Sequence, residues 1–171
     1  VRPIAIGGAF YKLACLHALA PLNAAIRSTL SPWQLGVAVP GGAEIGAHQL
    51  QLLLEDPARD FACLSLDISN AFNSRNRNIM LEKLYACPDL EPLFRIADWA
   101  YSASSPLWIR DSSGPLLHTL RSSNGSRQGC PIAGLLWCVS VDPLICQAIE
   151  EAPNTTLVAF MDDSNACGPP D

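Results

Sequence analysis

The sequence predicts an α/β (α+β) fold, in which an antiparallel sheet is backed by helices. Two observations carry this prediction. Residues 61–66 and 158–161 are short apolar runs, typical of strands, and both end in aspartates. Helical patterns and one β-hairpin pattern occupy the chain between them. The order strand, helices, hairpin, helix, strand favours a single sheet with helices packed against it.

The N-terminal part alternates extended and helical patterns. The elements predicted there are an edge strand at residues 2–6, helices at 9–20, 21–30 and 43–55, and a strand or extended loop at 33–39. Pro3 cannot donate a ladder hydrogen bond, so its strand belongs at an edge. Pro21 suits the first turn of a helix, and Asp56-Pro57 ends the last of these helices.

The C-terminal part contains the remaining elements. They are a strand at 61–67, helices at 76–86 and 90–101, a hairpin of residues 106–110 and 115–120, a helix at 132–149 and a strand from 158. Asp89 is expected to cap the second of these helices. Pro143 is expected to kink the long apolar helix that contains it.

The paired acids at the end of the chain indicate a metal site. Adjacent carboxylates in a buried position repel each other unless a cation lies between them. An Asp-Asp pair after an apolar run is also typical of a solvated turn. Asp67 favours the metal because, with the two strands side by side, it meets Asp162 at one sheet edge. Such a site holds two Mg²⁺ ions for phosphoryl transfer.

Length and composition restrict the class of protein. The 171 residues suggest one domain, and the start at Val1 suggests a piece of a longer protein. No apolar run reaches the roughly 18 residues that a membrane span needs, so we expect no membrane partner and an intracellular location, cytoplasmic or nuclear. The seven cysteines show no CxxC pair, which favours buried free thiols over a zinc site.

The net charge of −5 is not typical of a nucleic-acid-binding protein. The basic residues are unevenly placed, however. Arg75 and Arg77 follow the first acid, and Arg121 and Arg127 precede the second. An acidic total is compatible with a basic groove around an acidic metal site, so composition neither supports nor excludes a polymer substrate.

Two further features lie near the acids. Residues 127–131, Arg-Gln-Gly-Cys-Pro, precede a helix whose N-terminus, with Arg127, offers a positive surface for phosphate or a base. The alternative is a loop-to-helix junction with good capping chemistry. Phe72 follows Asp67 closely, where an aromatic ring would collide with a ribose 2′-hydroxyl and favour deoxyribose. The alternative is an ordinary core aromatic.

Five blocks in order resemble the reverse transcriptases of retroelements. They are Arg2-Pro3-Ile4, then Gln34-Leu35-Gly36-Val37 with Pro40-Gly41-Gly42-Ala43-Glu44, then Leu66-Asp67-Ile68-Ser69-Asn70-Ala71-Phe72-Asn73, then Ser126-Arg127-Gln128-Gly129-Cys130-Pro131, and finally Phe160-Met161-Asp162-Asp163. The last block matches the aromatic-x-Asp-Asp pattern of that family. The Arg-Pro-Ile and Gly-Gly-Ala-Glu blocks are most similar to non-LTR or tyrosine-recombinase elements.

The resemblance implies a fold and a reaction. It implies a polymerase right-hand palm at residues 56–171 with partial fingers at 1–55, and no thumb. It implies transfer of dNTPs to a primer 3′-hydroxyl by two Mg²⁺ ions, with Mn²⁺ as a substitute. The partners it implies are an RNA template, a DNA primer and the rest of a longer retroelement polyprotein.

The resemblance also implies site residues. Asp67 and Asp162 would be the main metal ligands, and Asp163 would complete the catalytic triad. The remaining implied residues bind the nucleotide: Arg2 contacts the triphosphate, Phe72 excludes ribonucleotides, and Gln128 and Gly129 line the pocket for the incoming nucleotide and template base.

Some residues depart from the family pattern. The lysine that the family places before the arginine is absent, and Ser164 follows the acids where many relatives have glycine. Two alternatives stay open. One is the palm of an RNA-dependent RNA polymerase, against which Phe72 argues. The other is a remnant that binds nucleic acid or a partner protein without catalysis, against which the three retained acids argue.

Overall fold

The computed structural model describes residues 4–58 and 60–170. Its helices are α1 (Ala9–Leu19), η1 (Ala20–Leu22), α2 (Asn23–Leu30), α3 (Gly42–Glu55), α4 (Ala71–Ser74), α5 (Arg77–Tyr85), η2 (Pro88–Leu93), α6 (Phe94–Tyr101) and α7 (Ala133–Glu151). Its strands are β1 (Ala62–Asp67), β2 (Ser105–Arg110), β3 (Leu116–Ser122), β4 (Thr156–Phe160) and β5 (Asp163–Gly168). The predicted α/β (α+β) class, an antiparallel sheet with helices, is confirmed.

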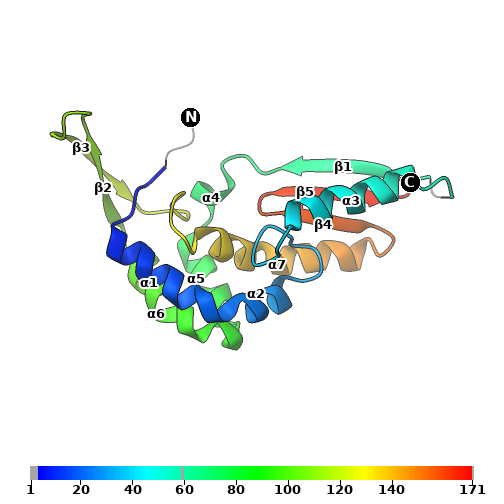
Figure 1. Ribbon diagram of the computed structural model, residues 1–171, viewed down its shortest axis with the longest axis horizontal. Helices are drawn as coiled ribbons and strands as arrows, with labels where there is room; N and C mark the ends of the chain where they lie inside the picture. Colours follow the sequence, from blue (N-terminus) through cyan, green and yellow to red (C-terminus); the bar gives the residue numbers. More distant parts are fainter. Residues whose placement is uncertain (1–3, 59, 171) are drawn as a thin grey trace.

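The main sheet has the strand order β1-β5-β4, and both of its pairings are antiparallel. β2 and β3 form a separate hairpin that projects at the opposite end of the molecule (Figure 1). The sequence predicted that the two acid-bearing strands lie side by side, and this was wrong. β5 separates β1 from β4, because the chain reverses directly after β4 and inserts its polar last strand between them.

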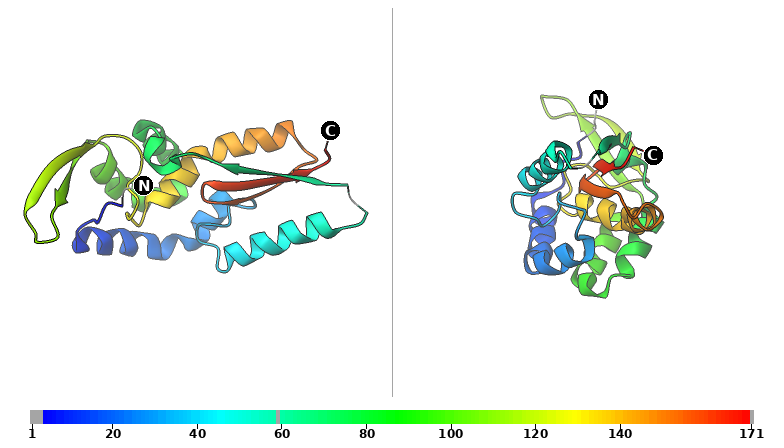
Figure 2. Two further views of the ribbon diagram at one scale, coloured as in Figure 1. Left: turned by 90° about the horizontal axis from the view of Figure 1, so that it is seen from above. Right: turned by 90° about the vertical axis from the view of Figure 1, so that its right-hand side faces the viewer.

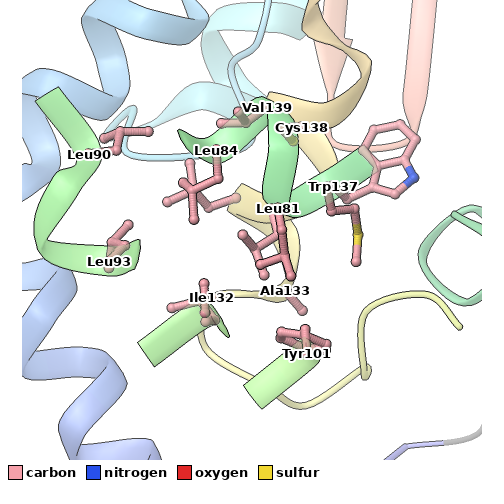
Figure 3. Packing of buried hydrophobic residues seen from close by; sticks show 14 of the residues in the cluster. Leu81, Leu84, Leu90, Leu93, Tyr101, Ile132, Ala133, Trp137, Cys138 and Val139 are labelled. Carbon is pink, nitrogen blue, oxygen red and sulfur yellow. The ribbon is translucent and has the colours of Figure 1, made fainter. Parts of the chain in front are cut away.

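The largest hydrophobic cluster lies among the helices rather than under the sheet (Figure 3). In α5 the buried Met80, Leu81 and Leu84 lie three or four positions apart, which places them on one helix face. They pack against α7, whose first nine residues are buried except for Gly134. Each large apolar side chain buried in this way contributes about 1.5–3 kcal/mol to folding. The cluster therefore fixes α7 as the central helix.

The sheet buries only part of its surface. Val158, Ala159 and Cys167 are buried, but every residue of β1 is exposed, including Leu64 at 59%. α3 packs on β4 and β5, and Figure 2 shows the sheet between α3 and α7. Gly46 allows this approach, since a β-carbon there would lie 3.2 Å from Cγ1 of Val158.

Residues 33–39, predicted as a strand or extended loop, form a loop with one isolated bridge, at Gln34. Two other local predictions were wrong. Residues 4–6 form no strand. The helix predicted at 90–101 divides into η2 and α6, with Cys87 rather than Asp89 at the N-cap. Pro92 lies inside η2, where its missing N–H opposes an α-helical ladder. Arg2 lies outside the described residues.

The expectation that no apolar run reaches the length of a membrane span was wrong, because two helical stretches do so. Residues 9–30, which comprise α1, η1 and α2, and the 19-residue α7 both meet the length and mean hydropathy of a span. Length and composition do not separate a span from a core helix, and the first half of α7 lies in the core. The absence of a membrane partner stays a prediction.

Candidate active site

The strand register brings two of the predicted acids together. Asp67, the last residue of β1, is the cross-strand partner of Asp163, the first residue of β5. Opposed residues in an antiparallel pair have β-carbons about 4.5–5.5 Å apart and point to the same face of the sheet. Both residues are exposed. The repulsion between two such neighbouring carboxylates is the condition that a bound cation relieves.

Asp162 occupies the tight turn between β4 and β5. It is half-buried and follows Met161, whose φ of 56° lies in the left-handed region that residues with side chains rarely adopt. The negative charge of Asp162 also affects a residue of α7. Burial, the largest cause, and the charge of Asp162 together raise the pKa of the Cys138 thiol to about 12. The turn lies against the central helix, since a β-carbon at Gly134 of α7 would lie 3.5 Å from the Met161 Cε.

The three acids fit a divalent cation by their chemistry. Carboxylate oxygens are the ligands that Mg²⁺ prefers, and strand pairing places Asp67 and Asp163 together with Asp162 directly adjacent in sequence. The side chains of the three acids do not, however, converge on one point. Within residues 4–58 and 60–170, no group of three His, Cys, Asp or Glu residues is gathered closely enough to hold a metal ion.

A cavity of about 420 Å³ lies beside the Asp162 turn. It brings together the three described residues that the sequence assigned to nucleotide binding, Phe72, Gln128 and Gly129, with Met161 from the turn itself. The rest of the lining comes from Val37, Ala38, Cys130, Pro131 and residues of α1, α2 and α7. Residues from distant parts of the chain thus form one concave surface next to a predicted metal ligand.

Phe72 lies on α4, a single turn that follows the left-handed Asn70. The ring is half-buried and packs on Trp137 of α7, with 5.6 Å between the ring centroids and an interplanar angle of 44°. The backbone of Phe72 is also fixed, since its carbonyl accepts a hydrogen bond of 2.6 Å from the Ser126 N–H. This support holds the ring at the cavity wall.

Gln128 and Gly129 form another part of the wall. Gly129 has a φ of 97°, and a β-carbon there would lie 2.6 Å from the carbonyl oxygen of Ala5. Only glycine meets both conditions without strain. The Ala5 N–H in turn donates to the Gln128 carbonyl oxygen at 2.8 Å. The N-terminal segment is therefore tied to the cavity through this turn.

Arg127, the residue before this pair, has structural contacts of its own. Arg127 donates to the Ser105 hydroxyl at 2.5 Å and to the Ala100 carbonyl at 3.1 Å. Its guanidinium also lies 4.7 Å from the ring centroid of Tyr101. These contacts hold the loop before α7 against α6 and β2.

Two more of the unevenly placed arginines point inward. Arg77 is 5% exposed and donates to the carbonyl oxygens of Gly125 and Ser122, each at 2.8 Å. Burial, the largest cause, lowers its pKa. Arg75 bonds to the hydroxyl and carbonyl oxygens of Ser140 in α7. Both arginines stabilise the walls around the site.

One residue with a clear structural role escaped the sequence argument. Gln34 belongs to a block quoted only for its resemblance, yet its buried side chain bonds to the backbone of Met161, next to Asp162. All seven cysteines are free thiols, as the sequence predicted, but Cys63 is exposed and Cys87 and Cys146 are only half-buried. The sequence offers no spacing rule for a side chain that pairs with a distant backbone group.

The sequence is similar to that of a retrotransposable-element protein. Over 170 residues the chain is 26% identical to the retrotransposable element SLACS 132 kDa protein of Trypanosoma brucei gambiense. The match covers 99% of this chain and 14% of that protein, so the chain spans about one seventh of this relative's length.

Solved structures of telomerase share the fold. The telomerase from Candida tropicalis in complex with a TWJ fragment of telomeric RNA has a TM-score of 0.62 at 14% identity, over 93% of this chain and 29% of that chain. The corresponding Candida albicans structure has a TM-score of 0.57 at 12% identity, over 94% and 30%. Residues 6–167 match the family model described as reverse transcriptase (RNA-dependent DNA polymerase). Since that match extends over nearly the whole chain, the chain belongs to the reverse transcriptase family.

Proposed function

We propose that this chain is the palm, with part of the fingers, of an RNA-directed DNA polymerase encoded by a retroelement. Residues 1–55 belong to the fingers and 56–171 to the palm. The family match and the retrotransposable-element relative support the reaction class and the origin. The observation that carries the proposal is the cavity beside the Asp162 turn, because it joins the nucleotide-binding candidates to the acidic end of the sheet. The chain acts as part of a longer polyprotein.

The carboxylates of Asp67, Asp162 and Asp163 hold the catalytic cations, two Mg²⁺ or alternatively Mn²⁺. When bound, these cations activate the primer 3′-oxygen and neutralise the leaving pyrophosphate. The protein contributes the positions of the acids. Asp67 and Asp163 are fixed by strand pairing, and Asp162 lies in the turn whose Met161 packs next to Gly134 of α7. Placing these groups on paired strands keeps their separation constant during nucleotide addition.

The cavity receives the incoming dNTP opposite the RNA template. Gln128 and Gly129 line the part that contacts the nucleotide and the template base. The Phe72 ring, held by Trp137, occupies the space that a ribose 2′-hydroxyl would need. Rejection by overlap favours deoxyribose without any hydrogen bond. Arg2 is proposed to contact the triphosphate, and it lies outside the described residues.

The metal assignment is tested with Asp162→Asn. The chain is expressed with its flanking segments, and primer extension is measured on an RNA template with dNTPs and Mg²⁺. We expect a loss of about hundredfold or more, since a misplaced catalytic cation forfeits several kcal/mol of transition-state stabilisation. Asp89→Asn, an exposed aspartate on η2, is the matched control and should retain activity. Full activity in Asp162→Asn would refute the metal assignment, and an inactive wild type would favour the non-catalytic alternative.

The sugar selection is tested with Phe72→Ala. The ratio of ribonucleotide to deoxyribonucleotide incorporation should rise by about tenfold or more, the range expected when one steric contact of roughly 1–3 kcal/mol is removed. Phe94→Ala is the control, because Phe94 is also half-buried and ring-paired, with Tyr85 at 5.0 Å, but does not line the cavity. A wild type that prefers ribonucleotides would instead indicate an RNA-dependent RNA polymerase.

A further inference from the structure

The segment around Gln34 extends the sheet beyond β4. The Leu35 N–H donates to the Ala159 carbonyl oxygen at 2.7 Å, and the Ala159 N–H donates to the Trp33 carbonyl oxygen at 2.8 Å. These bonds form a parallel bridge between Gln34 and Ala159. The N-terminal part of the chain is thereby joined to the strand that leads into the Asp162 turn.

The Gln34 side chain continues this pairing where the backbone ladder stops. Its Oε1 accepts hydrogen bonds from the Met161 N–H at 2.7 Å and from the Gly36 N–H at 2.9 Å. Its Nε2 donates to the Met161 carbonyl oxygen at 3.2 Å. A primary amide offers a donor and an acceptor together, so one side chain binds both backbone groups of Met161. Gln34 is only 3% exposed, which shields these bonds from water.

The backbone of Met161, which Gln34 holds, determines how the chain enters Asp162 and Asp163. Met161 is held at a φ of 56°, and the chain passes from it directly into Asp162 and Asp163. Gly36 packs against the backbone of Met161, since a β-carbon at Gly36 would lie 2.6 Å from the Met161 nitrogen. The Met161 side chain also lines the cavity. One set of contacts therefore sets both the acidic turn and a wall of the nucleotide cavity.

We infer that Gln34 is a positioning residue for the catalytic carboxylates, acting through the backbone of Met161. This inference rests on the proposed function, in which Asp162 and Asp163 bind the cations. Gln34 is not among the residues that line the cavity. A glutamine that only satisfied buried backbone groups would affect stability alone, whereas a positioning residue alters cation affinity and turnover at equal stability.

The test uses Gln34→Met, which keeps the length of the side chain and removes all three hydrogen bonds. Mn²⁺ binding is measured by electron paramagnetic resonance, and primer extension gives kcat and the KM for dNTP. We expect Mn²⁺ affinity and kcat each to fall about tenfold or more, because small misplacements of reacting groups cost this much, with KM changed less than about twofold. Gln34→Asn keeps a primary amide on a shorter side chain, so its values should lie between wild type and Gln34→Met. It decides the question if Gln34→Met does not fold.

Two controls separate positioning from stability. Gln51→Met changes an exposed glutamine that bonds only within α3, and it should behave as wild type. Leu90→Ala removes a fully buried side chain from the helical core, and it should lower the melting temperature without changing Mn²⁺ affinity. All measurements are made at a temperature where circular dichroism shows each variant folded.

The outcomes distinguish the two proposals. Wild-type kcat and Mn²⁺ affinity in a folded Gln34 variant would overturn the positioning role while the polymerase function stands. A wild type that binds Mn²⁺ but extends no primer would overturn the polymerase function, and the Mn²⁺ comparison would still decide the role of Gln34. A wild type without Mn²⁺ binding would overturn the positioning role, because no cation site would exist to be positioned.

Discussion

Gly129 is the residue that tests the cavity wall most directly. In Gly129→Ala the new β-carbon would meet the Ala5 carbonyl oxygen at 2.6 Å, on a backbone whose φ of 97° disfavours any side chain. We expect the free energy of unfolding to fall by about 1–3 kcal/mol from backbone strain, and further from the clash. Urea denaturation of the wild type and the variant measures this difference.

Gly114→Ala provides the matched control for this substitution. Gly114 has a φ of 102°, close to that of Gly129, but a β-carbon there would meet no atom within 4 Å. It therefore reports the backbone strain without the clash. Gly129→Ala should destabilise the protein more than Gly114→Ala, and equal losses would show that the contact with Ala5 does not matter.

The residues that the sequence could predict are those with a local pattern. Asp67 and Asp162 follow apolar strands, and this pattern placed both at the end of the main sheet. The resemblance supplied Phe72, Gln128 and Gly129, which the structure brings to one cavity. Gln34 and Arg77 could not be assigned roles from a pattern, since their partners are distant backbone groups that any residue type supplies.

Among the elements, β5 shows why a strand can be missed. Its sequence, Asp-Ser-Asn-Ala-Cys-Gly, lacks the apolar alternation and β-branched residues that favour strands. Its extended form comes from tertiary pairing, with β1 on one side and β4 on the other. The helices α1, α3, α5 and α7 were predicted closely, because their apolar spacing and their end signals are local.

The connection from β3 to α7 depends on a buried arginine from α5. Arg77 makes hydrogen bonds to the backbone of Ser122 and Gly125, which lie in the chain leading to Gln128. In Arg77→Met these buried acceptors lose a charged donor, so we expect a loss of about 3 kcal/mol or more in the free energy of unfolding. Chemical denaturation measures the loss, and limited proteolysis of residues 122–127 reports the local opening.

Arg95→Met is the control for this element. Arg95 lies on α6 and is exposed, so its replacement should change stability by no more than about 0.5 kcal/mol. Similar losses for Arg77→Met and Arg95→Met would show that the connection is held by other contacts.

At the scale of the whole molecule, the site lies at the junction of two differently built parts. The helical core is closely packed around α7, and the sheet leaves β1 exposed (Figures 1 and 3). The Asp162 turn and the cavity lie where α7 meets the sheet. The core can therefore hold one side of the site rigid while the exposed face of the sheet stays accessible to a large substrate.

Two cysteine thiols, one in α7 and one in β5, predict how the stability of the whole protein changes at alkaline pH. Burial raises the pKa of the Cys138 thiol to about 12 and that of the Cys167 thiol to about 11, from an ordinary value of 9.0. Above pH 9 the unfolded chain releases thiol protons that the folded protein retains. The free energy of unfolding should then fall with rising pH, by up to about 1.4 kcal/mol per pH unit for each thiol.

The stability from these thiols is fully present below pH 9 and is lost as the pH rises towards the folded pKa values. Cys138→Ala removes one of the two thiols and should make the decline between pH 9 and 11 shallower than in the wild type. Urea denaturation at a series of pH values measures both slopes. Equal slopes would contradict the prediction, and they would mean that Cys138 ionises in the folded protein as readily as in the unfolded chain.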